Sequence, residues 1–405
     1  MPEPRTSLLR DRDFRLVAGS VALSAFGDWV AIVALGLQVK ELTDSGWAIA
    51  ALWICLFGPS VAVAGHAGWL VDRFETTRLL AVTAAAGALV ATAAGFASDP
   101  VLLLGLTALL GLVLAISQPA EFALVPPLAG RDRVQEANGR IETARFVGFG
   151  LGPVLGALLF SFGGAELAMA VNGATFAAVA CAALALRIRR EPIVETGASA
   201  PRARDGITAL LGDDVLSLGM LVAFGSLCFM SAVWVAELFF VEDVLHLGQV
   251  AYGTWLSLWT AGMALGALLL ARRVAAGALA GVALAAVAVQ GAALAVPAAF
   301  LGVGVFLACA VVGGLAHGVK NVMFRSLIHL RVPDALHGRA FAGYNAIRNT
   351  AELGAFAVGG LLVATIGPRG TLGYAGGLSC LVGLLGLVAL VRLRQRAPVA
   401  VPSPA

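Results

Sequence analysis

The chain has 405 residues, of which 60% are hydrophobic and only 13% are charged, about half the roughly 25% of charged residues in soluble proteins. A soluble domain cannot cover so much apolar surface, so the composition excludes a soluble enzyme and a disordered chain. The formal net charge of +3 is too small and too scattered for a nucleic-acid-binding surface.

Apolar stretches long enough to cross a membrane recur along the chain. A transmembrane helix needs about 20 apolar residues to cross roughly 30 Å of hydrocarbon. The sequence predicts twelve such helices, at residues 14–39, 47–70, 79–97, 100–127, 140–163, 165–187, 216–240, 250–271, 274–296, 299–328, 340–364 and 370–392. Residues 1–15 are charged and no small-residue cleavage site follows a short apolar core, so we expect no cleavable signal peptide.

Lys and Arg residues concentrate in alternate loops, which predicts that both termini are cytoplasmic. The longest polar stretch, 188–215, is rich in Arg, Pro, Gly and Ser and predicts a cytoplasmic linker. It separates two six-helix bundles, at 1–187 and 216–393, and a cytoplasmic tail follows at 394–405.

The two halves of the chain resemble each other weakly. A shift of 203 residues places Arg145 on Arg348. The same shift places Gly156 on Gly359. Together with the count of six spans on each side of the linker, this suggests an internal repeat, which is typical of secondary transporters that hold the substrate near mid-membrane.

The first span carries a polar stripe in which Ser24 and Asp28 share one helix face. A charged side chain near mid-bilayer needs a partner or a water-filled cavity. We therefore expect Asp28 to couple transport to proton or substrate binding, with Ser24 and Trp29 lining the cavity. The alternative is a structural Asp28 that bonds to a neighbouring helix.

The fifth span has glycines at a spacing of four, at Gly148, Gly152 and Gly156. These glycines fall on one face, where another helix can pack closely. Pro153 removes one backbone hydrogen bond and permits a bend.

Further ionisable and polar residues interrupt other spans. The candidates for coupling or for lining a cavity are Glu142, Arg145, Trp234, Glu237, His317, Lys320, Asn321, Asn345, Arg348, Asn349 and Glu352. The last four have offsets of 0, 3, 4 and 7, so they share one helix face. Arg348 and Glu352 can neutralise each other or exchange a proton. Lys320 can instead extend to the cytoplasmic surface.

The loop after the second span resembles a loop motif of the major facilitator superfamily. The matching residues are Gly68, Leu70, Asp72, Arg73 and Arg78. The chain departs from the family pattern at Glu75 and Thr76. The resemblance implies the major facilitator fold, an all-α integral membrane protein of twelve helices, and a conformational latch at Gly68, Asp72, Arg73 and Arg78.

The fifth span also resembles the superfamily's G-x-x-x-G-P-x-x-G-G motif, with Ala157 in place of the last glycine. In that family the motif marks drug-proton antiporters. The first span and the run 118–142 resemble the branch of enterobactin exporters and Tap-type multidrug efflux pumps, and the lysophospholipid transporter branch is also similar. The Arg common in the fourth span of drug antiporters is absent, because 100–127 contains no Lys or Arg.

The leading functional hypothesis is a proton-coupled exporter of amphipathic small molecules, such as drugs, siderophores or secondary metabolites. Lys40 and Lys320 are the chain's two lysines and each follows Val, so no phosphate-binding loop is present to hydrolyse ATP. The alternatives are a lipid transporter, an importer, and a receptor or scaffold that transports nothing. We expect a monomer in a bacterial-type inner membrane, in contact with membrane lipids, with no enzymatic activity, cofactor, metal or nucleic-acid partner.

Overall fold

The computed structural model describes residues 8–130, 133–189, 208, 210–270, 273–333 and 336–396. All regular elements in these ranges are helical. The long elements are α1 (Arg12–Thr43), α2 (Gly46–Ala62), α3 (Ala64–Arg73), α4 (Thr76–Gly95), α5 (Pro100–Ala123), α7 (Val134–Ala185), α9 (Asp214–Phe239), α10 (Gln249–Leu265), α11 (Leu279–Ala299), α12 (Val303–Arg331) and α13 (His337–Arg396). The short elements are α6 (Val125–Ala129), the 3-10 turns η1 (Leu8–Arg10) and η6 (Ala276–Ala278), and the π-helical turns η3 (Phe240–Val244) and η4 (Gly266–Leu270).

The predicted twelve-helix membrane fold is confirmed. Within the described ranges, eight helices are long and apolar enough to cross a membrane, and two of these, Glu136–Ala185 and Gly343–Gln395, have 50 and 53 residues and can cross twice. The shorter apolar helix α2 and the helix α10, which η4 continues to Leu270, fit the remaining two predicted spans. Large apolar side chains are open to the surroundings along these helices, with Leu89 75% and Phe162 82% exposed, as lipid-facing residues must be.

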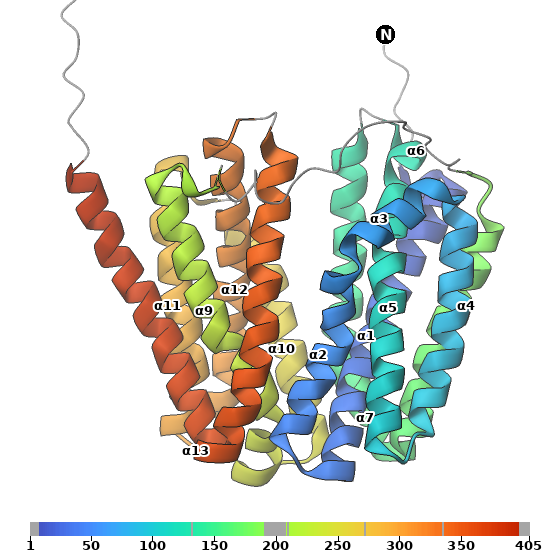
Figure 1. Ribbon diagram of the computed structural model, residues 1–405, viewed down its shortest axis with the longest axis horizontal. Coiled ribbons are helices and arrows are strands. Elements are labelled where there is room, and N and C mark those ends of the chain that lie inside the picture. The colour runs from blue at the N-terminus through green and yellow to red at the C-terminus, as the bar shows by residue number, and fades with distance from the viewer. Residues whose placement is uncertain are drawn as a thin grey trace, which may run out of the picture. The chain divides into compact units, whose positions relative to one another are not determined.

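Two of the predicted connections are glycine kinks inside long helices. Gly164 has φ 64° and ψ −165°, and Gly367 has φ 72° and ψ 171°. L-residues rarely adopt positive φ, so glycine allows these sharp reversals. Figure 1 shows α13 (orange to red) reversing direction at such a kink. The second predicted span, 47–70, differs in being two helices, α2 and α3, separated at Val63.

Acidic caps begin several helices where the polar loops end. Asp11 Oδ1 accepts from Phe14 N (2.9 Å) at the start of α1. Asp99 Oδ1 accepts from Leu102 N (2.8 Å), and Pro100 is the first residue of α5. Asp213 Oδ1 accepts from Leu216 N (2.8 Å) at the start of α9. Such caps satisfy amide groups that have no partner inside the helix.

The contacts divide the chain into two compact units. Unit 1 combines residues 1–198 with 238–261, and unit 2 combines 199–237 with 262–405. In unit 1, α1 packs against α7, and α4 packs against α5 and α7. In unit 2, α11 packs against α12 and α13, and apolar residues of α9, α11, α12 and α13 share one core. The predicted boundaries at 187, 215 and 393 stay a prediction, since 190–207 and 397–405 lie outside the described residues.

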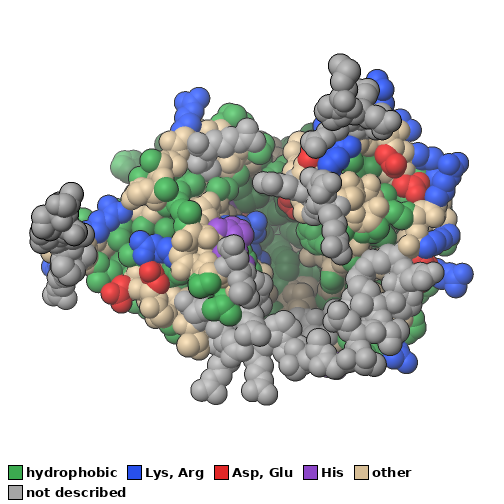
Figure 2. All heavy atoms as spheres, turned by 90° about the horizontal axis from the view of Figure 1, so that it is seen from above, with side chains coloured by type: hydrophobic (Ala, Val, Ile, Leu, Met, Phe, Trp, Pro, Cys, Tyr) green, Lys and Arg blue, Asp and Glu red, His purple; other side chains and the backbone are tan. Residues whose placement is uncertain are grey.

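Basic side chains gather on one end of unit 1. Figure 2 looks onto that end and shows Lys and Arg side chains (blue) standing around its margin. Arg73 ends α3 and Arg78 lies in the first turn of α4. This clustering agrees with the charge pattern from which cytoplasmic termini were predicted.

Candidate functional site

Asp28 of α1 belongs to a cluster of charges inside unit 1, here called the Asp28 cluster. Its members are Asp28, Glu121 of α5, and Glu142 and Arg145 of α7. Asp28 is half-buried and lies within electrostatic range of Glu121 and Arg145. Arg145 Nη2 lies 3.8 Å from Glu121 Oε2, and Arg145 Nε lies 3.7 Å from Glu142 Oε1. The structure thus joins three of the predicted coupling residues.

The single positive charge of Arg145 cannot neutralise the negative charges of this cluster. Its guanidinium lies over the Phe122 ring, 5.0 Å from the centroid. Its Nε and Nη2 atoms are buried without a hydrogen-bond partner, because both ion pairs are longer than hydrogen bonds. Three carboxyl groups therefore face one guanidinium. The surplus negative charge can take up a proton or a cationic group.

Glu121 is a member of the cluster that the sequence prediction left out of the site. It is only 6% exposed. In the sequence it is the one acidic residue in a long apolar span without Lys or Arg. That isolation was the available signal, because an acid in such a span needs a partner from another helix.

The glycine motif of the fifth span is the surface on which α1 packs. A Cβ atom added at Gly148 would lie 2.5 Å from Ala22 O, and one at Gly152 would lie 2.5 Å from Trp29 Cβ. One at Gly156 would lie 2.9 Å from Val30 Cα. The three glycines thus bring the α7 backbone against the part of α1 that holds Asp28.

Pro153 is the point where α10 joins this contact in unit 1. A Cβ atom added at Gly253 of α10 would lie 2.5 Å from Pro153 O. One residue further on, Val154 N donates to Ser257 Oγ of α10 (3.2 Å). The α7 backbone at Pro153 and Val154 therefore packs against α10 and donates a hydrogen bond to it, and α10 comes from the second half of the chain.

Several predicted cavity residues of α1 and α9 are partly buried. Ser24, Trp29 and Trp234 are half-buried, and the Trp29 ring lies edge-on to Phe149, 5.6 Å between centroids. Glu237 is 2% exposed, and its Oε2 has no hydrogen-bond partner. Their contact with a substrate stays a prediction.

The predicted latch is described only in part. The surroundings of Gly68 and the side chain of Asp72 lie outside what the structure describes. The Arg73 guanidinium lies 5.4 Å from the Trp69 ring centroid, and Arg78 Nε lies 3.7 Å from Glu75 Oε2. The latch role therefore stays a prediction.

Glu75, which departs from the family pattern, caps α4. Its carboxylate accepts from Thr77 N and Arg78 N, both at 3.0 Å. Burial would raise the pKa of Glu75, but these hydrogen bonds and the nearby Arg189 outweigh burial and lower the pKa. The acid at this position stabilises the start of the helix.

A second group of charges lies inside unit 2, around a small cavity of about 30 Å³, here called the Lys320 cavity. Its lining residues are Ala223, Leu227, His317, Lys320, Asn321, Phe324, Tyr344, Arg348 and Glu352. Arg348 Nε lies 3.5 Å from Glu352 Oε1, and Gln290 Nε2 lies 2.9 Å from His317 Nδ1. Five of the predicted site residues meet here. The neighbouring Asn345, which is exposed, and Asn349, which is half-buried, are not among the lining residues.

An ion cluster that the sequence prediction did not assign lies at the end of α1. Lys40 Nζ lies 3.0 Å from Glu242 Oε2, 2.8 Å from Asp243 Oδ1 and 3.6 Å from Asp44 Oδ1. Glu242 and Asp243 belong to the π-helical turn η3, which is part of unit 1. The available sequence signal was a lone lysine directly after the first predicted span and two adjacent acids just after the seventh.

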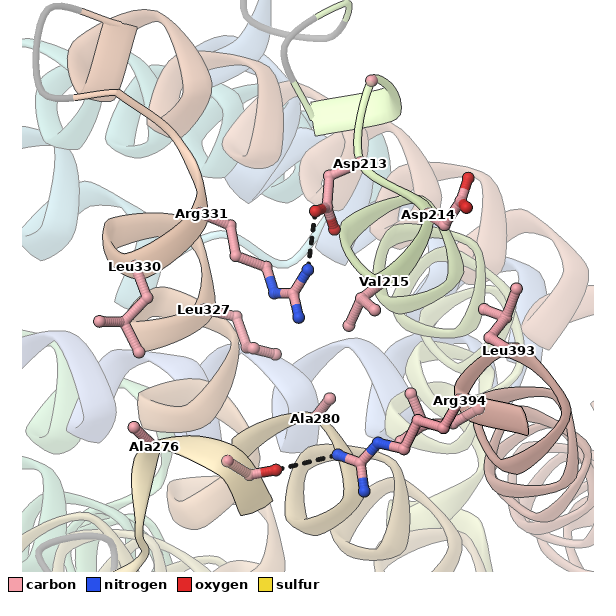
Figure 3. Close-up of a pocket in the computed structure, with 13 residues that line it drawn as sticks. Asp213, Asp214, Val215, Ala276, Ala280, Leu327, Leu330, Arg331, Leu393 and Arg394 are labelled. Carbon is pink, nitrogen blue, oxygen red and sulfur yellow. Dashed lines mark hydrogen bonds and ion pairs between the residues drawn. The ribbon is translucent and has the colours of Figure 1, made fainter. Parts of the chain in front are cut away.

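A larger groove of about 1090 Å³ opens at the ends of α9, α11, α12 and α13 in unit 2. Figure 3 shows Arg331 directed at Asp213, with 2.7 Å between Nη1 and Oδ2. Arg394 Nη2 donates to Gly277 O (2.9 Å). Both guanidinium groups already have partners, so this groove is a weaker candidate for charged substrates than the Lys320 cavity. Across the part of the chain that the structure describes, no group of three His, Cys, Asp or Glu could hold a metal ion.

Comparisons with known proteins agree with this architecture. The family model described as Major Facilitator Superfamily matches residues 17–287. The lysophospholipid transporter LplT of Klebsiella pneumoniae subsp. pneumoniae is 28% identical over 137 residues, and LplT of Salmonella paratyphi B is 30% identical over 137 residues. Each match covers 34% of this chain and 34% of the relative, so it spans about a third of the relative's length.

Solved structures of transporters share the fold over nearly the whole chain. The nucleoside transporter NupG superposes with a TM-score of 0.76 at 15% identity, covering 93% of this chain and 99% of that chain. A bacterial homologue of the iron transporter ferroportin superposes with a TM-score of 0.70 at 18% identity, covering 96% of this chain and 100% of that chain. At these identities the likeness is one of fold.

Proposed function

Because the chain belongs to the Major Facilitator Superfamily, we propose that this membrane transporter exports amphipathic small molecules in exchange for protons. The observation that supports proton coupling is the Asp28 cluster. Its carboxyl groups outnumber its single guanidinium, and Glu121 is nearly buried. A carboxylate that loses water in one access state takes a proton and releases it when water returns.

The glycine motif supports export as the direction of transport. It resembles the motif of drug-proton antiporters, and its glycines press α7 against α1 beside Asp28. A change in the packing of these two helices would therefore change the surroundings of the coupling acid. Both termini are cytoplasmic in this proposal, in keeping with the positive-inside pattern.

The test measures transport by the purified protein after it is reconstituted into vesicles in the inside-out orientation, with a pH gradient imposed across their membrane. Two fluorescent amphiphiles serve as probes, ethidium as a cation and NBD-labelled lysophosphatidylglycerol as an anion. We expect gradient-driven accumulation of at least one probe, which stops when an ionophore collapses the gradient. Accumulation that is unchanged after collapse would contradict proton coupling, and no accumulation of either probe would contradict the export of amphiphiles.

Asp28→Asn is the variant that identifies the coupling group. We expect it to abolish accumulation driven by the gradient while downhill movement of the probe continues, because the amide cannot carry the proton. Asp99→Asn is the matched control, since Asn also caps a helix and Asp99 lies at the start of α5 outside the cluster. Equal pH dependence in the two variants would remove Asp28 from the mechanism.

A lipid transporter is the second candidate. It is supported by the similarity to the LplT proteins, whose printed name is lysophospholipid transporter. In the vesicle assay this function would appear as movement of the lysophosphatidylglycerol probe without movement of ethidium.

A further inference from the structure

Lys320 lies deep in α12, far from either end of the helix. Arg331, the last residue of α12, is eleven residues further on, which is about 16 Å along a helix. That distance exceeds the length of a lysine side chain, so Lys320 cannot reach the surface by extending along the helix. The alternative interpretation from the sequence, a lysine that snorkels to the interface, does not fit this position.

Lys320 is also buried, and among the described residues no counterion lies in direct contact with it. The residue is 4% exposed. Within the described part of the chain its ammonium has no hydrogen bond and no ion pair, and the nearest charge of opposite sign that acts on it is Glu352, which lines the same cavity. A buried charge that has no partner is strongly unfavourable. Its presence therefore needs an explanation beyond packing.

Arg348 adds a second positive charge at the same depth. It lies eleven residues from His337, the first residue of α13, and α12 and α13 are joined by a short loop. Its Nε atom is buried without a hydrogen-bond partner, while its side chain as a whole is 40% exposed. Arg348 lines the Lys320 cavity, so part of this side chain is open to a ligand there.

The Lys320 cavity carries a surplus of positive charge. Lys320 and Arg348 face a single carboxylate, Glu352, whose nearest oxygen is 3.5 Å from Arg348 Nε. The cavity also offers the Asn321 amide and the Tyr344 hydroxyl as hydrogen-bond donors. One negative charge on a ligand would balance the surplus, and a planar guanidinium beside an ammonium suits an oxyanion.

We infer that the Lys320 cavity binds a singly charged oxyanion, a carboxylate or a phosphodiester, carried by the transported molecule. This inference rests on the proposed function, because it names the charged end of the amphiphile that is exported. The apolar lining residues Leu227 and Phe324 would contact the part of the ligand next to the anion. The cavity of about 30 Å³ is smaller than such a group, so binding has to widen it.

The test measures ligand binding by the purified protein in detergent. The readout is the shift in melting temperature when a probe is added. The probes are lysophosphatidylglycerol, oleate, uncharged monoolein and inorganic phosphate. We expect lysophosphatidylglycerol or oleate to raise the melting temperature while monoolein does not. A shift with inorganic phosphate that depends on Lys320 would also support the site and would show that the anion alone is sufficient. An equal shift with monoolein and the anionic amphiphiles would overturn the inference.

Lys320→Met separates a ligand site from a structural lysine. We expect the ligand-free variant to melt at the same or a higher temperature, because it loses a buried charge that shares its single acid, Glu352, with Arg348. Its affinity for the anionic probe should fall at least about tenfold. Lys320→Arg should keep the response, and so should Arg325→Met, which removes an exposed charge from the same helix. A Lys320→Met protein that melts lower and binds the anion as well as the wild type would refute the site.

The binding assay needs no proton gradient and no transport. If vesicles fail to export either probe while the detergent assay shows anion binding that depends on Lys320, the proposed function is wrong and the anion site stands. If vesicles accumulate a probe but Lys320→Met leaves the binding of anions unchanged, the function stands and this inference is wrong.

Discussion

Gly152→Ala is the substitution that tests most directly how α7 packs on α1. The added Cβ atom would lie 2.5 Å from Trp29 Cβ and 2.9 Å from Phe26 O. Carbon atoms in contact normally stand about 3.5–4.0 Å apart, so the two helices have to separate locally by about 1 Å. Overpacking of this kind costs about 1–3 kcal/mol.

The measurement is thermal unfolding of the purified protein in detergent, combined with proton-driven transport. We expect the apparent melting temperature to fall by about 2–12 °C. Transport should also slow, because the displaced segment of α1 carries Asp28. Gly150→Ala is the matched control, since no heavy atom lies within 4 Å of its added Cβ and alanine favours the helix. Equal melting temperatures for the two variants would refute a close contact at Gly152.

Two further predictions concern charges outside the proposed coupling and anion sites. Lys40→Gln should lower the melting temperature, because Lys40 Nζ lies 3.0 Å from Glu242 and 2.8 Å from Asp243. In a double-mutant cycle with Asp243→Asn, the coupling energy between the two side chains should be about 0.5–3 kcal/mol. Additive effects of the two substitutions would contradict the ion pair. Glu75→Gln should destabilise the protein by about 1 kcal/mol at pH 7. Since the pKa of folded Glu75 is lowered from 4.5, the stabilisation of the folded protein by this carboxylate is present above that value and is lost as the pH falls through the folded pKa. The melting temperatures of the variant and the wild type should therefore converge below pH 4.5. A difference that stays constant with pH would contradict the cap.

The helices and their close contacts could be predicted from the sequence because both depend on local patterns. Apolar length alone predicts the spans. Glycines spaced four residues apart predict a narrow helix face, and the structure shows that Gly148, Gly152 and Gly156 lie against α1. The glycine pattern could not identify the partner helix, because a glycine face allows the backbone of any neighbouring helix to approach closely.

The charge clusters could not be predicted, because they combine side chains from distant parts of the chain. Arg145 meets Glu142 on its own helix, which the spacing of three residues allows, but it also meets Glu121 from α5. Lys40 meets Glu242 and Asp243 two hundred residues away. Only the tertiary fold brings these groups within ion-pair distance.

The internal repeat predicted corresponding positions without predicting their chemistry. Arg145 and Arg348 are related by a shift of 203 residues, yet their surroundings differ in the sign of the surplus charge. Arg145 faces more acids than it can neutralise, whereas Arg348 shares a cavity lining with Lys320 and the single acid Glu352. A surplus of carboxyl groups can exchange protons, and a surplus of cations can hold an anion. Two copies of one helical scaffold can therefore divide coupling and substrate binding between them, because the roles depend on a few side chains from neighbouring helices.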